Sequence, residues 1–158
     1  MGTEPMEENL QQLIHDLLQT QRLGVLATSA DGHPYTTLVG FAAGDSLAEI
    51  YFATHRSTRK FANLSHDDRT TLLIDNRSNQ PGDFRDAAAL TAFGTANEVP
   101  AEKQAALQQV FLAKHPMLKE FVLSPGCALC RISVQRYSLV QRFQNVVELV
   151  LDDTHSAS

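Results

Sequence analysis

The sequence predicts a mainly β protein: a small antiparallel barrel of six or seven short strands with helices at its periphery. The first observation behind this prediction is a series of apolar and β-branched runs that recur along the 158 residues. The second is the turn chemistry between these runs, as at Asp31-Gly32-His33-Pro34 and Gly44-Asp45, which indicates hairpins. A closed barrel is favoured over an open sheet because closure removes the sheet edges.

Helical periodicity is confined to a few segments, and the remaining apolar runs read as strands. In chain order we expect a helix over 6–20, strands over 22–29, 35–43 and 49–54, a short helix from 57, strands over 70–75 and 88–99, helices over 101–114 and 117–123, and strands over 127–142 and 146–151. Residues 76–85 are rich in Asn, Gly and Pro and are predicted to form a loop. Gly40 is expected to mark a bulge or a close backbone approach.

Length and composition limit the class of protein. One domain over residues 1–158 is expected, with 1–5 and 152–158 flexible. The net charge of −5 argues against a general nucleic-acid binder, because neutralising phosphates needs a basic face. No apolar run approaches the roughly 18 residues of a membrane span, and residues 1–10 lack the apolar segment of a secretory signal. The expected location is therefore the cytoplasm.

The two cysteines, Cys127 and Cys130, are three positions apart in a predicted strand. Their Cα atoms would lie about 10 Å apart, which exceeds the roughly 7 Å that a disulfide tolerates. A zinc site would need a second ligand pair, and no second CxxC or suitably spaced histidine pair exists. We therefore expect packed thiols and no metal site.

Residues 49–66 carry the strongest chemical signal in the chain. An apolar strand is followed by a short helix, with Ser57 as its expected N-cap. The next residues are Thr58, Arg59 and Lys60, although cations at a helix N-terminus oppose the macrodipole by about 0.3–1 kcal/mol each. Their position beside free backbone N–H groups and hydroxyls is explained if a phosphate binds there. The alternative is that these cations form an ordinary solvated face.

Three stretches, in this order and spacing, carry a family resemblance. They are Gly32-His-Pro-Tyr-Thr-Thr-Leu-Val, then Phe52-Ala-Thr-His-Arg-Ser-Thr-Arg-Lys, then Phe93-Gly-Thr-Ala followed by Pro-Ala-Glu and a helix ending in Lys-His-Pro. Together they resemble the FMN-binding split-barrel family, whose best known member is pyridoxamine 5′-phosphate oxidase. The similarity runs from about Arg22 to Val150, which is nearly the whole domain.

The resemblance implies an antiparallel split β-barrel that binds FMN and acts as a flavin-dependent oxidoreductase on a small molecule. It also implies a homodimer with the cofactor at the subunit interface. The implied cofactor-binding residues are Thr58, Arg59 and Lys60 at the phosphate with Thr54 nearby, Thr37, Leu38 and Val39 along the isoalloxazine, and Asn76 at the ring or ribityl chain. For Asn76 the alternative is a cap on its own backbone.

The chain departs from the oxidases at several positions. An Arg and a Lys of the oxidases correspond here to Thr37 and Ala42, and their flavin-contacting Gln maps near Ala88 or Ala89. The Tyr, Arg and Ser that hold the substrate phosphate correspond to Phe111, His115 and Lys119. Oxidation of pyridoxamine phosphate is therefore not expected, and the sequence names neither a substrate nor a catalytic residue.

Two other functions stay open. Within the fold, the cavity could hold haem or a deazaflavin, with His115 or His155 as trial haem ligands and His55 as a further titratable group. Outside it, Gly44-Asp45-Ser46-Leu47 matches the nucleophile block of the GDSL serine esterases, with His155 in an Asp-x-x-His sequence. A serine nucleophile needs a strand-to-helix junction, whereas Ser46 is expected in a hairpin.

Overall fold

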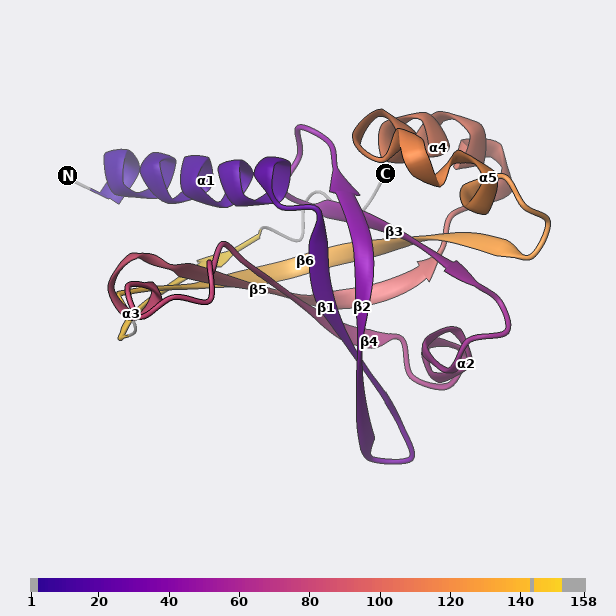
Figure 1. Cartoon of the computed structure of the whole chain (residues 1–158), viewed down its shortest axis with the longest axis horizontal. Coiled ribbons are helices and arrows are strands. Elements are labelled where there is room, and N and C mark those ends of the chain that lie inside the picture. The colour runs from indigo at the N-terminus through magenta and orange to yellow at the C-terminus, as the bar shows by residue number, and fades with distance from the viewer. Residues whose placement is uncertain (1–2, 143, 152–158) are drawn as a thin grey trace.

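The computed structural model describes residues 3–142 and 144–151, and its elements are shown in Figure 1. The strands are β1 (Leu23–Ala30), β2 (His33–Ala43), β3 (Glu49–His55), β4 (Arg69–Asp75), β5 (Ala88–Glu98), β6 (Cys127–Gln141) and β7 (Asn145–Val150). The helices are α1 (Thr3–Thr20), α2 (Arg59–His66), α3 (Asp83–Asp86), α4 (Ala101–Lys114), α5 (Lys119–Val122) and the 3₁₀ turn η1 (Pro116–Leu118).

All strand pairings are antiparallel, in the order β3-β2-β1-β4-β5-β6-β7. An additional pairing between β3 and β6 closes the first six strands into a barrel, and β7 lies outside the closure as a partner of β6 alone. The predicted mainly β barrel with peripheral helices is thereby confirmed. Closure explains why the long β6 strand is needed, since it pairs with β3, β5 and β7.

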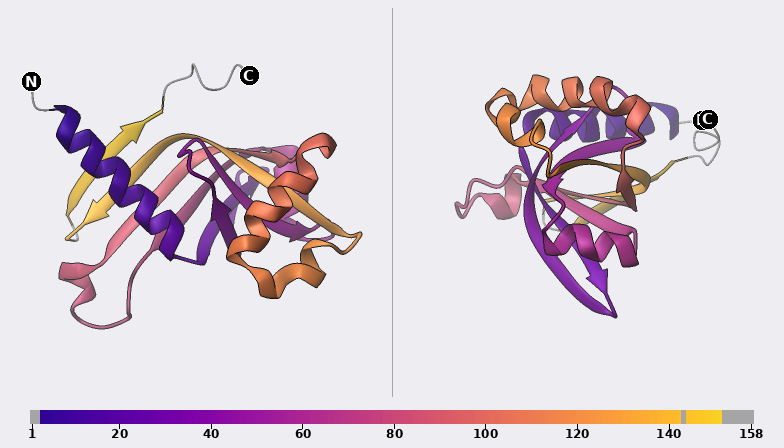
Figure 2. Two further views of the ribbon diagram at one scale, coloured as in Figure 1. Left: turned by 90° about the horizontal axis from the view of Figure 1, so that it is seen from above. Right: turned by 90° about the vertical axis from the view of Figure 1, so that its right-hand side faces the viewer.

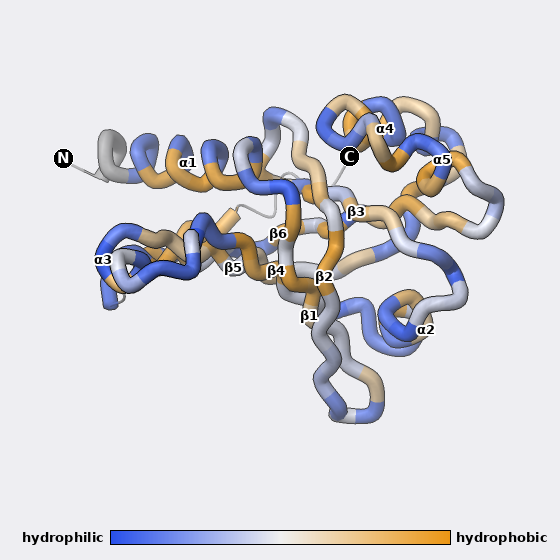
Figure 3. The backbone as a smooth tube through the Cα atoms, viewed as in Figure 1, coloured by the Kyte–Doolittle hydropathy of each residue, from blue (hydrophilic) through white to orange (hydrophobic). Residues whose placement is uncertain are grey.

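The barrel interior is the main hydrophobic core, and α1 closes one side of it. Ile14 and Leu18 of α1 are fully buried in the same cluster as Phe41, Phe52 and Tyr137. Figure 3 shows the apolar side of α1 turned toward the sheet and its polar side turned away. The apolar positions of this helix recur every three or four residues, which is why one face docks while the other stays solvated.

A second, smaller core lies outside the barrel wall under α4 and α5. It joins Phe111 of α4 and Val122 of α5 to Ala42, Tyr51 and Leu129 of the strands. The two views of Figure 2 show this helical corner packed at the opposite end of the molecule from β7. Packing in this corner places α4, η1 and α5 against β2, and the candidate site lies beside that contact.

Of two glycines in strands, Gly94 is explained by a close contact and Gly40 is not. The pairing of β5 with β6 shifts register between Phe93 and Gly94, and a Cβ on Gly94 would lie 2.1 Å from the Ser133 carbonyl oxygen. Gly40 keeps a regular register with Leu23, and a Cβ there would meet only side-chain atoms of Leu118 and His115 at 3.7–3.9 Å, so neither the predicted bulge nor a close backbone approach is found.

Several local expectations are revised. Helix α2 begins at Arg59 with Thr58 as its N-cap, so the expected cap at Ser57 was one position early. The segment 76–85 contains the short helix α3, which the loop prediction missed. Thr3–Pro5 belong to α1, whereas residues 1–2 and 152–158, expected to be flexible, lie outside the described residues.

Both cysteines are free and buried, as expected for packed thiols. Burial raises the pKa of the Cys127 thiol, and it raises the pKa of Cys130 to about 12. A thiol with a raised pKa carries little thiolate at neutral pH, so neither cysteine is set up as a nucleophile.

Candidate functional site

The candidate site lies where β2 and β3 separate. These strands pair only from Phe41 with Phe52 to Ala43 with Ile50. Beyond Phe41 the two strands diverge, so that Leu38–Gly40 pair with β1 alone and Ala53–His55 with β6 alone. Unpaired strand edges present backbone N–H and C=O groups to whatever fills the gap. The barrel is therefore split at this point.

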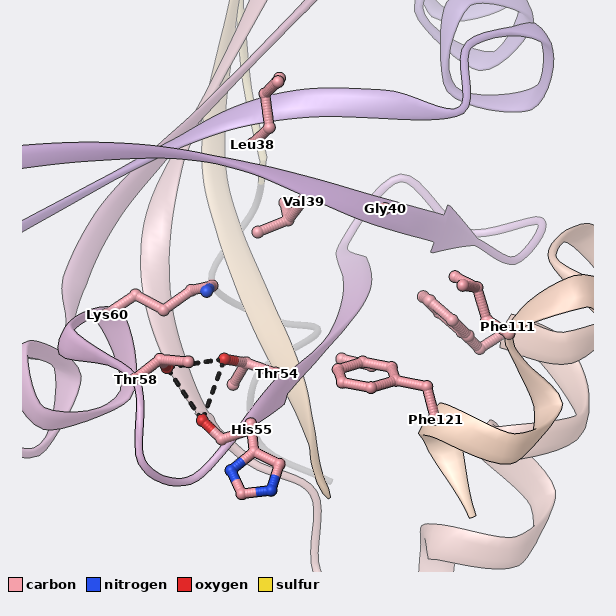
Figure 4. A pocket seen from close by; sticks show the side chains of 11 residues that line it. Leu38, Val39, Gly40, Thr54, His55, Thr58, Lys60, Phe111 and Phe121 are labelled. Atoms are coloured by element: carbon pink, nitrogen blue, oxygen red, sulfur yellow. Dashed lines mark hydrogen bonds between the residues drawn. The ribbon is translucent and has the colours of Figure 1, made fainter. Parts of the chain in front are cut away.

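A cavity of about 250 Å³ occupies the split. Its walls come from β2 (Leu38–Gly40), β3 (Ala53–His55), the start of α2 (Thr58 and Lys60), and the helical corner (Phe111, Leu118 and Phe121). Figure 4 shows the hydroxyls and the lysine on one side of this cavity and the two phenylalanine rings on the other. The cavity thus has a polar end and an apolar end.

The polar end is organised by the N-cap of α2. The Thr58 hydroxyl accepts from the Phe61 N–H at 3.4 Å and donates to the His55 carbonyl at 2.9 Å. The Thr54 hydroxyl lies 2.8 Å from the Thr58 hydroxyl and 3.2 Å from the same carbonyl. Thr54 is itself buried, so the two hydroxyls form a fixed pair at the beginning of the helix.

Lys60 is the only Lys, Arg, Asp or Glu among the residues that line this cavity. Its side chain is half-buried, and desolvation lowers the pKa of its amine. Within residues 3–142 and 144–151, the amine has no hydrogen-bond or ion-pair partner. Figure 4 shows it directed across the gap toward Val39. A partly desolvated cation without a counter-ion is a favourable contact for a bound anion.

The two arginines of this segment face elsewhere. Arg56 donates to the carbonyls of Pro125 and Cys127, each at 3.1 Å, and forms an ion pair with Glu98. These contacts brace the connection before α2 against the start of β6. Arg59 is exposed and lies 5.9 Å from the centre of the Tyr35 ring, outside the cavity wall.

Of the other residues predicted from the sequence, Leu38 and Val39 line the cavity and Thr37 does not. Asn76 lies outside the cavity wall, and its side-chain oxygen accepts from the Ala88 N–H at 2.7 Å. Asn76 therefore caps a backbone N–H 12 positions away at the start of β5, whereas the alternative stated from the sequence was a cap on its own backbone.

Both described histidines near the site have structural partners. His115 is buried, and its Nε2 lies 2.7 Å from the Phe41 carbonyl, so this nitrogen carries the proton that it donates. Nδ1 of His55 accepts from the Ser57 N–H at 3.4 Å, and a Cβ on Gly126 would lie 2.4 Å from Nε2 of the same ring. Nε2 of His115 is therefore occupied, and Figure 4 shows the His55 ring turned away from Val39 and the two phenylalanine rings.

Ser46 lies in the exposed connection between β2 and β3, where its hydroxyl accepts from the Ala48 N–H at 3.1 Å. This is the predicted hairpin position, and the expected esterase partner His155 lies outside the described residues. Across the part of the chain that the structure describes, no three His, Cys, Asp or Glu side chains group as metal ligands.

At the apolar end of the cavity, the resemblance placed Phe111 at a substrate-phosphate position of the oxidases, but the sequence did not single out Leu118 or Phe121. Phe121 and Leu118 are three residues apart in the helical corner, and both reach the cavity beside Phe111. The available signal was the apolar i, i+3 spacing after the His115-Pro116 break, which indicated a short helix but not its direction.

A closed six-stranded antiparallel barrel with one split edge, a helix N-terminus at the split and a helical corner across it defines a split-barrel protein. The family model described as pyridoxamine 5′-phosphate oxidase matches residues 10–141. The chain therefore belongs to the pyridoxamine 5′-phosphate oxidase family. Comparison with curated proteins finds no match.

Solved structures share the fold at low sequence identity. A haem-binding protein from Mycobacterium smegmatis is 20% identical with a TM-score of 0.75, covering 85% of this chain and 55% of its own. The chain thus spans just over half of that protein's length. General stress protein 26 from Bacillus anthracis is 20% identical with a TM-score of 0.71, covering 90% of this chain and 99% of its own.

A FAD-binding protein from Mesorhizobium loti is 18% identical with a TM-score of 0.66, covering 81% of this chain and 90% of its own. At these identities the similarity establishes the fold. Of the helices in the described ranges, none has the length and apolar character that crossing a membrane requires.

Proposed function

We propose that the protein binds FMN in the split between β2 and β3 and acts as a flavin-dependent oxidoreductase. The observation that carries this proposal is Lys60, a half-buried amine with no partner in the described chain, beside the hydroxyls of Thr54 and Thr58. The Lys60 cation and the N-terminus of α2 match the chemistry of a terminal phosphate, and the Thr54 and Thr58 hydroxyls, which in this structure bond the His55 carbonyl, lie at the same end.

The remaining walls suit the rest of the cofactor. Leu38 and Val39 of β2 would lie along the isoalloxazine, where the divergence of β2 from β3 leaves strand-edge groups available. FMN, when bound, would supply hydride or electron transfer, and the protein would supply position and electrostatics. Arg59 is a secondary contact in this proposal, because its guanidinium lies outside the cavity wall.

We also propose that the site is completed by a second copy of the chain. A volume of about 250 Å³ is below the roughly 300–1,000 Å³ of sites that enclose a whole ligand of this size. Next to the cavity, Leu38, Val25 and Leu73 form a row across β2, β1 and β4 on the outer face of the barrel. Leu38 is 65% exposed and Leu23, on the same face, is 60% exposed. Exposed apolar surface beside a half-formed cavity is the expected face of a homodimer.

A haem site has less support, because Nε2 of His115 donates to the Phe41 carbonyl and the His55 ring is turned away from the phenylalanine rings (Figure 4). The free, buried cysteines agree with the cytoplasmic location proposed from the sequence.

The test compares FMN with riboflavin, which lacks the phosphate. We expect the wild type to bind FMN with flavin absorption bands and no Soret band, and Lys60→Ala to weaken FMN binding by at least about tenfold. That factor follows from about 1.5–3 kcal/mol for a charge-assisted hydrogen bond. Riboflavin affinity should be the same in both proteins. Arg59→Ala should have a smaller effect than Lys60→Ala because Arg59 is exposed.

Lys103→Ala is the matched control, because Lys103 is an exposed lysine of α4 that does not line the cavity. Fluorescence titration of each flavin measures the affinities. An equal loss of FMN and riboflavin affinity in Lys60→Ala would remove the phosphate assignment, and a wild type that takes up no FMN would remove the proposed function.

A further inference from the structure

The end of the cavity opposite Lys60 is built from apolar side chains of three consecutive helical elements. Phe111 comes from α4, Leu118 from η1 and Phe121 from α5. Phe111 is fully buried, whereas Phe121 is 40% exposed, so the apolar wall runs from the interior to the surface. Figure 4 shows the rings of Phe111 and Phe121 on the side of the cavity opposite Lys60.

The polar groups of this corner are directed away from the cavity. His115 donates through Nε2 to the Phe41 carbonyl, and its ring centre lies 4.8 Å from that of Phe111. The Lys114 amine donates to the Leu18 carbonyl at 2.7 Å and lies over the Phe41 ring. The two polar side chains at the end of α4 are therefore engaged in contacts within the protein.

The charged residues of the next turn also lie off the wall. Leu118 and Phe121 share one side of the helical turn because they are three positions apart. Lys119 and Glu120, between them, are exposed and do not line the cavity. A ligand at this end would therefore meet two phenyl rings and a leucine, and no cation that could neutralise a phosphate.

We propose that this wall is the substrate subsite and that it takes a planar, uncharged aromatic group. The proposal rests on the proposed flavin site, since it assigns the polar end of the same cavity to the phosphate of FMN. Aromatic side chains favour offset-stacked or edge-to-face contact with another ring, and the absence of charge at this end disfavours an ionised one.

The experiment titrates two matched compounds into FMN-saturated protein by calorimetry: 2-naphthol, which is uncharged at neutral pH, and its anionic phosphate ester. We expect naphthol to bind at least about tenfold more tightly than the ester. Phe121→Ala should weaken naphthol binding by at least about fivefold and leave FMN affinity within about twofold. Phe84→Ala is the matched control, because it removes a 69% exposed phenyl ring on α3 outside the cavity wall.

Three results would each overturn the subsite: no naphthol binding to the wild type, tighter binding of the ester, or a Phe121→Ala effect no larger than that of Phe84→Ala. A loss of FMN affinity in Phe121→Ala equal to the loss of naphthol affinity would also overturn it, because the wall would then hold the cofactor itself. The proposed function is judged separately by FMN uptake and Lys60→Ala. If FMN does not bind, the same naphthol titration without flavin decides the apolar subsite alone.

Discussion

Gly94→Ala tests whether the register shift between β5 and β6 requires a residue without a Cβ. The added Cβ would lie 2.1 Å from the carbonyl oxygen of Ser133, 2.9 Å from its carbonyl carbon and 3.1 Å from the Cα of Val134. Real Cβ contacts do not fall below 3.0 Å, so the oxygen must retreat by about 0.9 Å. All three obstacles are backbone atoms of the paired strand, which side-chain rotation cannot move.

Overpacking of this kind costs about 1–3 kcal/mol, and we expect the upper end because strand pairing must be distorted. A loss of about 3 kcal/mol corresponds to a decrease of about 6–12 °C in Tm for a domain of this size. Urea unfolding followed by far-ultraviolet circular dichroism measures the free energy of unfolding. Gly44→Ala is the control, because a Cβ there would meet no atom within 4 Å. A Gly94→Ala protein within about 0.5 kcal/mol of the wild type would refute the reasoning.

Two further predictions concern the dimer and Lys114. Leu23→Asp places a charge on the proposed dimer face, so the mass measured by light scattering should fall from that of two copies to that of one. FMN binding should also weaken, although Leu23 does not line the cavity. A monomeric wild type would contradict this prediction. Desolvation lowers the pKa of Lys114 to about 8, whereas an unfolded lysine keeps its ordinary value of 10.5. Between these values the unfolded chain binds more protons, so the free energy of unfolding of the wild type should rise with pH relative to that of Lys114→Met. Parallel stability curves from pH 7 to 10.5 would contradict it.

The strands and the cavity-lining segment around Thr58 could be predicted because their signals are local. Apolar runs bounded by turn residues fix the existence of strands, and a cationic turn after a strand is visible without knowledge of the fold. Which of the two predicted cations, Arg59 or Lys60, lines the cavity could not be predicted in the same way. Helix α2 begins at Arg59 with Thr58 as its cap, one position later than expected, and each position on a helix turns the side chain by about 100°. That rotation leaves Lys60 in the cavity wall and Arg59 outside it.

Residues whose role depends on distant partners were the least predictable. Asn76 bonds the backbone of Ala88, 12 positions further along the chain, and neither alternative stated from the sequence gave this partner. Phe121 reaches the site because α4, η1 and α5 pack on the outside of β2 and β3 through Ala42 and Tyr51. Such contacts follow from the closure of the barrel and are absent from any short stretch of sequence.

The split itself links the two ends of the site. His115 and Leu118 lie over Gly40, at the point where β2 separates from β3. His115 also donates to the carbonyl of Phe41, which is the β2 residue at the end of the β2–β3 pairing. At the position where the pairing of β2 with β3 ends, the helical corner therefore contacts Gly40 and donates a hydrogen bond to the Phe41 carbonyl. Because the same corner supplies Phe111 and Phe121, one packing arrangement both keeps the cavity open and gives it an apolar wall. The polar end is set instead by the local sequence around Thr58. The two ends of the cavity therefore depend on different parts of the chain: the apolar wall on the packing of α4, η1 and α5, and the polar end on the residues around Thr58.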